Sequence, residues 1–208
     1  MEKETDYSAA VSETASMLQK GDIESATRLS GEALANCDND LREAYNKSEA
    51  LNDKVLEFMD MATLHVRCLR MAGLAGEAFE CAVGALLTPE IYRAADKIDE
   101  ARKACLYFDM VRSAIDMFDH AGDACDSITE DHRGYIMSYA ASLLYYNYSK
   151  AVEAGSDNPQ LAEIYSFLKS IASSGAIQSP KIRLGDTEVD PSDAGPILVD
   201  IMSRAAAL

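Results

Sequence analysis

The sequence has little of what marks several large classes of protein. It contains no tryptophan and only five prolines, and no uninterrupted apolar stretch approaches the ~18 residues that a membrane-spanning helix requires. Residues 1–6 are mostly charged or polar and no apolar run follows them, which is not the pattern of a secretory signal peptide. We therefore expect a soluble, cytoplasmic protein that does not cross a membrane.

Positive charge is also scarce. The chain carries 19 Lys and Arg against 35 Asp and Glu, a formal net charge of −16, and no basic cluster interrupts this balance. Binding to nucleic acid depends on neutralising phosphates with Lys and Arg, so we exclude nucleic acid as a partner. An anionic membrane surface is disfavoured for the same reason. The acidic surface either keeps the protein in solution or steers a basic partner toward it.

Histidine and cysteine are too scattered to predict a metal centre or an active site. The five cysteines mostly follow helical apolar patterns, so we expect reduced thiols within the core. His65 and Cys68 are three apart and could face one metal ion, but no other His or Cys lies within helical reach; Cys125 and His132 form no stronger pair. The Glu-x-x-His pairs of di-iron bundles are absent. We predict no catalytic, metal-binding or cofactor-binding residue, and a chain that is not an enzyme.

What the sequence does contain is typical of helices. Hydrophobic residues at 48% and charged residues at 26% allow a packed core, and Ala, Leu, Met and Glu lose little entropy in a helix. Apolar spacings of three and four predict helices over residues 6–20, 23–36, 41–72, 75–87, 90–121, 133–153, 160–173 and 191–208. Between them lie an unassigned segment at 123–132, a turn at 155–159, and a loop with a short extended pair at 181–184 and 187–189. The two longest segments are either single helices or pairs that break near Asn52 and Asp96.

Glycine, proline and polar residues indicate where these helices end. Gly21 supplies a left-handed stop, and Asp22 supplies a cap for the next helix. Residues 36–40 are polar and predict a turn, and Gly73 closes the helical segment that follows. Pro89 fits the first turn of the next helix, where its missing N–H donor carries no penalty.

Two segments of the chain repeat at an offset of 52 residues. Residues 21–26 (GDIESA) align with residues 73–78 (GLAGEA), and an Ala-Leu pair follows at 33–34 and at 85–86. In each copy the glycine turns the chain back, and both alanines lie on one face of the following helix. Small side chains there let the two helices of a hairpin approach closely, and the leucine fills the adjoining groove.

This pattern resembles the tetratricopeptide repeat family, whose motif has Gly at the hairpin turn, Ala early in the second helix, then Ala and a terminal Pro. The matching residues are Gly21, Ala26 and Ala33 in one copy and Gly73, Ala78, Ala85 and Pro89 in the other. The resemblance covers roughly residues 6–38 and 59–89, and residues 90–174 only by analogy. The offset departs from the family period of ~34 residues, which implies longer first helices.

The resemblance implies an all-α fold of antiparallel helical hairpins, stacked as a tetratricopeptide-like right-handed α-solenoid over residues 1–174. A loop at 175–190 then leads to the amphipathic helix at 191–208, which we expect to cap the same domain. The implied function is a protein- or peptide-binding scaffold without catalytic activity. Two alternatives stay open: a helical enzyme or small-ligand sensor domain with a closed polar pocket, and a structural subunit of a larger assembly.

A tyrosine-rich segment is the strongest candidate for a binding surface. Tyr135, Tyr139 and Tyr146 follow spacings of four and seven, and Asn147 and Lys150 add polar groups. Tyrosine combines a large apolar body with a polar tip, which suits protein interfaces. We predict that these residues contact another protein or peptide, or a second copy of the chain; packing between hairpins is the alternative. Further tyrosines lie nearby at positions 145, 148 and 165.

Overall fold

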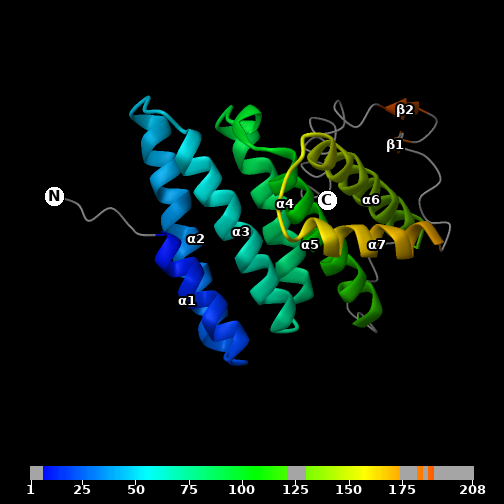
Figure 1. Cartoon of the computed structure of the whole chain (residues 1–208), viewed down its shortest axis with the longest axis horizontal. Coiled ribbons are helices and arrows are strands. Elements are labelled where there is room, and N and C mark those ends of the chain that lie inside the picture. The colour runs from blue at the N-terminus through cyan, green and yellow to red at the C-terminus, as the bar shows by residue number, and fades with distance from the viewer. Residues whose placement is uncertain (1–6, 121–129, 174–181, 185–186, 190–208) are drawn as a thin grey trace.

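The computed structural model of the protein describes residues 7–120, 130–173, 182–184 and 187–189 (Figure 1). Its secondary structure there is helical apart from one short two-stranded hairpin, which confirms the predicted all-α class. The helices are α1 (Tyr7–Gln19), α2 (Ile23–Asn46), α3 (Asn52–Met71), α4 (Ala75–Ile91), the 3-10 turn η1 (Ala95–Lys97), α5 (Glu100–His120), α6 (Glu130–Glu153) and α7 (Leu161–Ser173). Strands β1 (Ile182–Leu184) and β2 (Thr187–Val189) pair antiparallel where a short extended pair was predicted. The predicted helix at 191–208 lies outside the described residues.

Two glycines end α1 and α3 in the same way. Gly21 and Gly73 both have a φ of 77°, a left-handed conformation that costs glycine less than any other residue. The backbone N–H after each glycine reaches back to a carbonyl of the preceding helix, at 3.0 Å for Asp22 and 2.9 Å for Leu74. The Asp22 carboxylate also accepts from the backbone N–H of Ser25 at 3.2 Å. The predicted stop and cap are therefore confirmed.

Four alanines of the sequence repeat are buried. Ala26 and Ala33 of α2 are 0% and 5% exposed, and Ala78 and Ala85 of α4 are 0% and 3% exposed. Helix α2 packs against α1 and α3, and α4 packs against α3 and α5. A methyl group at each position lets the helix backbones approach closely, which a larger side chain would prevent. The sequence repeat is therefore also a repeat of buried small residues.

The predicted turn at residues 36–40 is wrong, because α2 continues through it to Asn46. Cys37, Leu41 and Ala44 are at most 2% exposed and extend the buried stripe that begins earlier in the same helix. Burying these side chains outweighs the weak helix propensity of the polar residues between them. Asp40, one of these polar residues, accepts a hydrogen bond from the Tyr7 hydroxyl of α1 at 2.6 Å. The helix predicted over residues 23–36 is therefore ten residues longer than expected.

Both long predicted segments are divided in the structure. The segment at 41–72 contains the end of α2, a connection, and the start of α3 at Asn52. The segment at 90–121 contains the end of α4, then η1 around Asp96, and then α5. Of the two alternatives that the sequence left open, the break near each of these residues is the correct one.

Pro89 does not begin a new helix, as the sequence predicted, but lies inside α4 near its end. Pro89 is buried, while a proline within a helix removes one backbone hydrogen bond and crowds the preceding turn. Helix α4 ends two residues later, at Ile91. Burial of the ring favours keeping Pro89 in the helix, and the early end limits the loss of hydrogen bonds.

Helix α5 occupies the centre of the described structure. It contacts α3, α4, α6 and α7, and every residue from 104 to 111 is buried. In Figure 1 the helices α1 to α5 follow one another across the molecule, and α6 and α7 lie at the end opposite α1. Two cavities of the molecule lie where other elements meet α5.

Replacing Gly73 by alanine tests its role as a helix stop. The Gly73→Ala variant should lose about 1 kcal/mol of unfolding free energy, because alanine resists the left-handed conformation. Gly84→Ala is the matched control: Gly84 lies within α4, and an added Cβ would meet no atom within 4 Å. The Gly84→Ala control should gain roughly 0.5–1 kcal/mol of unfolding free energy, because alanine has the higher helix propensity. Urea denaturation followed by circular dichroism measures both, and equal effects would contradict the assignment.

Candidate functional site

The structure separates the residues of the predicted partner site. All five belong to α6, but the side chains of Tyr135 and Tyr139 lie outside the described residues. Asn147 is only 6% exposed, whereas Lys150 is exposed and Tyr146 is half-buried. The three described residues therefore do not form one exposed patch. Tyr146 and Asn147 lie on the part of α6 that faces the core, and they line a cavity.

This cavity has a volume of about 230 Å³ and lies where α3, α4, η1, α5 and α6 meet. We call it the Tyr107 pocket, after a tyrosine of α5 in its wall. Its apolar wall includes Met59, Leu86, Pro89, Ile98 and Leu143. Glu90, Glu100 and Lys103 contribute its charged groups. The pocket therefore combines an apolar lining with several polar groups, which is the usual composition of a small-ligand site.

Two polar side chains of the Tyr107 pocket are almost fully buried. Tyr107 is 8% exposed, and burial together with the charge of Glu90 raises the pKa of its phenol well above the ordinary value. Asn147 donates from Nδ2 to the carbonyl oxygen of Leu143 at 2.8 Å. At neutral pH the pocket therefore presents a neutral phenol and an oriented amide.

A second hollow of about 200 Å³ lies between α3, α5 and the loop before α7. Arg102 contributes its guanidinium, with Nε 2.7 Å from Oδ1 of Asp60 and Nη2 3.0 Å from Oδ2. The same group also binds Asp99. Nε2 of Gln160 is buried and has no hydrogen-bond partner among the described residues. Arg67 also lines this hollow, and its guanidinium lies 3.4 Å from Asp109. Because carboxylates pair with both arginines, the hollow offers little uncompensated positive charge to an anion.

A buried ion cluster joins α3 to α5. Asp109 of α5 is 0% exposed, and its carboxylate lies 2.9 Å from Arg70 and 3.4 Å from Arg67. Arg70 also lies 3.3 Å from Asp116, which is on the same helix as Asp109. Burial raises the pKa of Asp109, and the two arginines oppose that rise. The cluster contains two positive and two negative charges, so it is neutral overall. Its ion pairs hold α3 against α5.

His65 and Cys68, the candidate metal ligands of the sequence, pack between helices. His65 Nδ1 lies 2.9 Å from the hydroxyl oxygen of Ser30 on α2, and burial lowers the pKa of the imidazole. Cys68 is 0% exposed, and burial raises the pKa of its thiol. In the described part of the chain no group of three or more His, Cys, Asp and Glu side chains is arranged to hold a metal ion.

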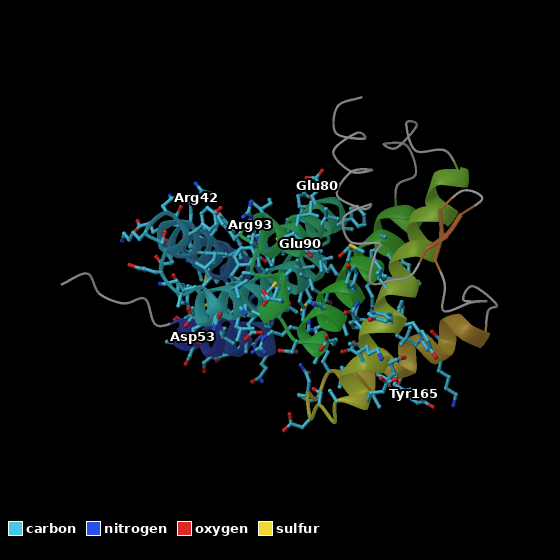
Figure 2. All side chains as sticks on the ribbon, turned by 90° about the horizontal axis from the view of Figure 1, so that it is seen from above. Arg42, Asp53, Glu80, Glu90, Arg93 and Tyr165 are labelled. Carbon is cyan, nitrogen blue, oxygen red and sulfur yellow. The ribbon has the colours of Figure 1, made fainter. Side chains whose placement is uncertain are left out.

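An exposed aromatic surface lies on the hairpin of α6 and α7. Tyr145, Tyr148 and Val152 follow spacings of three and four along α6, and the rings of Tyr148 and Tyr165 stack with centroids 6.4 Å apart. Tyr145, Val152 and Tyr165 are 42%, 51% and 53% exposed, and Tyr165 lies at the outer edge of the molecule (Figure 2). We call these four residues the tyrosine surface. The sequence shows that tyrosines cluster at positions 145, 148 and 165. It does not show which of them face outward.

No protein-family model matches the chain, and no curated protein or solved structure is significantly similar to it. Among the described helices none is long and apolar enough to cross a membrane.

Removing Asp109 should destabilise the protein strongly. In Asp109→Ala the arginines lose their buried partner, and breaking a buried ion pair in this way costs about 3 kcal/mol. Asp116→Ala is the matched control, because the Asp116 side chain is 38% exposed and such pairs contribute at most about 1 kcal/mol. Chemical denaturation of the three proteins measures the difference. Equal losses would show that burial does not set the strength of this cluster.

The lowered pKa of His65 predicts a pH-dependent stability. The unfolded chain binds a proton near the ordinary histidine pKa of about 6.5, whereas the folded protein takes it up only at lower pH. The contribution of His65 is therefore complete above that value and is lost as the pH falls. His65→Gln should flatten the dependence of unfolding free energy on pH between about pH 7 and 5. Identical slopes for the two proteins would contradict this role of burial.

Proposed function

We propose that this protein is a non-catalytic helical scaffold that binds a basic segment of another protein at the tyrosine surface. The observation that carries this proposal is the exposure of three large side chains, Tyr145, Val152 and Tyr165, around a stacked tyrosine pair. Tyrosine is enriched at the centres of protein interfaces because it buries a large area with few rotatable bonds. Packing within the described helices leaves these side chains accessible.

The net charge of the chain supports a basic occupant. The 35 acidic residues exceed the 19 basic ones, and the Lys150 ammonium of the same hairpin is already 2.8 Å from Glu153. An acidic protein attracts a basic partner over distances near the Debye length, which raises the rate of encounter. Aromatic rings also attract Lys and Arg side chains directly. The partner segment should therefore combine basic and apolar residues.

The proposal includes a tetratricopeptide-like arrangement, with α1–α2 and α3–α4 as two copies of one hairpin in a right-handed solenoid. Equal φ values at Gly21 and Gly73 and the burial of the four repeat alanines support it. A stack of this kind gives each hairpin a rigid neighbour on either side. Helices α6 and α7, which pack against α5, can then present their outer faces without deforming.

The proposal also places the protein in the cytoplasm. Every cysteine that the structure describes is a free thiol, and those at positions 37, 68 and 105 are buried. Free thiols persist in a reducing compartment, where disulfides are rare. Burial raises the pKa of Cys105 to about 12 and that of Cys81 to about 11. Both thiols therefore stay protonated and poorly reactive at neutral pH.

Selection of peptides from a random library tests the proposed function. Peptides retained by the full chain should be enriched in Lys, Arg and apolar residues, and added salt should weaken their binding. The double variant Tyr145→Ala, Tyr165→Ala should bind them at least about tenfold more weakly, since interface tyrosines contribute roughly 1–2 kcal/mol each. Tyr45→Ala is the matched control, because Tyr45 is 43% exposed on α2.

Three outcomes would overturn the proposal. Selected peptides could be acidic, or the double variant could bind as well as the control. Light scattering could instead show a dimer that the double variant abolishes, and the occupant of the tyrosine surface would then be a second copy of the chain. The proposal expects a monomeric protein, and it expects the Tyr45→Ala control to select the same peptides as the unaltered chain.

A further inference from the structure

The Tyr107 pocket is lined by two polar side chains, Tyr107 and Asn147, that are 8% and 6% exposed. No hydrogen bond joins the Tyr107 hydroxyl to any other described residue. Asn147 Nδ2 donates to a backbone carbonyl at 2.8 Å, and only the NH₂ half of an amide can do so, which fixes the side-chain orientation and leaves Oδ1 as an acceptor that bonds no other described residue. Both atoms therefore remain available for a hydrogen bond within the described part of the pocket. A donor placed in this pocket would therefore satisfy Asn147 and bond the oxygen of Tyr107.

The charged groups of the pocket favour a positive ligand. Its wall includes two carboxylates, Glu90 and Glu100, and one ammonium, Lys103. No ion pair joins any of these three side chains to another described residue. The pocket wall therefore carries one net negative charge, and the whole protein carries a formal net charge of −16. A cation entering the pocket would gain from both fields.

The size and the walls of the pocket restrict the ligand to a small molecule with an apolar body. The volume of about 230 Å³ is below the roughly 300–1,000 Å³ of pockets for drug-sized ligands. Met59, Leu86 and Leu143 supply apolar contacts, and the rings of Tyr107 and Tyr146 lie in the same wall. Aromatic rings attract ammonium groups within about 6 Å of the ring centre.

From these features we infer that the Tyr107 pocket binds a small organic amine. The ammonium group donates to Oδ1 of Asn147 and to the phenol oxygen of Tyr107, with Glu90 balancing its charge. The apolar body packs against the methionine and leucine side chains of the wall. A carboxylate or phosphate of the same size is disfavoured, because the two carboxylates of the wall outnumber the single ammonium of Lys103.

This site is separate from the tyrosine surface. The pocket is lined by residues 143, 146 and 147 of α6, whereas the tyrosine surface uses residues 145, 148 and 152 of the same helix. The two sets lie on different sides of α6, so one can be altered without the other. The test below therefore does not depend on the partner proposed for the tyrosine surface.

Titration with phenethylamine, monitored by amide NMR and calorimetry of the full chain, tests the inference. We expect binding with a dissociation constant of the order of 0.1–1 mM, as suits a ligand of this size, with amide shifts clustered at residues 103–107 and 143–147. The neutral 2-phenylethanol should bind at least about fivefold more weakly, because it carries no charge for the carboxylates to balance. The anionic 3-phenylpropionate should not bind.

Two substitutions test the contacts of Tyr107 and Glu90, and a third is the control. Tyr107→Phe removes only the hydroxyl, and Glu90→Gln removes only the charge of an exposed side chain; each should weaken phenethylamine binding about fivefold. Glu80→Gln is the matched control, since Glu80 is an exposed residue of the same helix α4 and both glutamates are labelled in Figure 2. Its binding should equal that of the unaltered chain.

Any of four results would overturn the inference. These are no shifts at 10-fold the expected dissociation constant, equal binding of the carboxylate probe, shifts elsewhere in the protein, or equal losses in the Glu80 and Glu90 variants. Because Glu90 is exposed, its variant keeps the fold, and the test stays decisive even if Tyr107→Phe destabilises the protein.

Discussion

Close contact between helices through small side chains is the constraint on which the rest of the structure depends. The alanines at 26, 33, 78 and 85 are buried in α2 and α4, and each pair follows a glycine with a φ of 77°. The glycine reverses the chain, and the alanines let the returning helix approach its neighbours. Larger residues at these positions would separate the helices and open the core. The order of the helices across the molecule follows from this repeated contact.

Helix α5 packs against four other helices, and two of its polar side chains, Asp109 and Tyr107, are buried as a result. Asp109 is tied to Arg70 and Arg67 of α3, and Tyr107 lines a cavity on α5 among α3, α4, η1 and α6. The ion cluster is neutral and holds two helices in register, whereas the phenol is left without a described partner. One helix therefore supplies both a structural tie and the principal group of the candidate ligand site.

Helix α6 connects the two proposed sites, because its tyrosines alternate between environments. Tyr145 points to solvent at 42% exposure, whereas Tyr146 and Asn147 line the Tyr107 pocket. A rotation of about 100° per residue along an α-helix accounts for this change of side. An outward aromatic stripe and an inward polar pair are thus available on one helix, on different sides of it.

The sequence alone determined the helical class, the stops at Gly21 and Gly73, the turn at Gly155 and the small residues of the repeat, because these depend on local conformation and on side-chain size. It failed at residues 36–40 and at Pro89, where burial against other helices outweighed local propensity. Only the tertiary structure decided which side of α6 meets the core, and hence that Asn147 belongs to a cavity and Tyr165 to a surface. It also brought Glu90, Tyr107 and Asn147 together from three helices. Contacts between residues distant in the chain leave no periodic pattern along it, so spacing could not have predicted them.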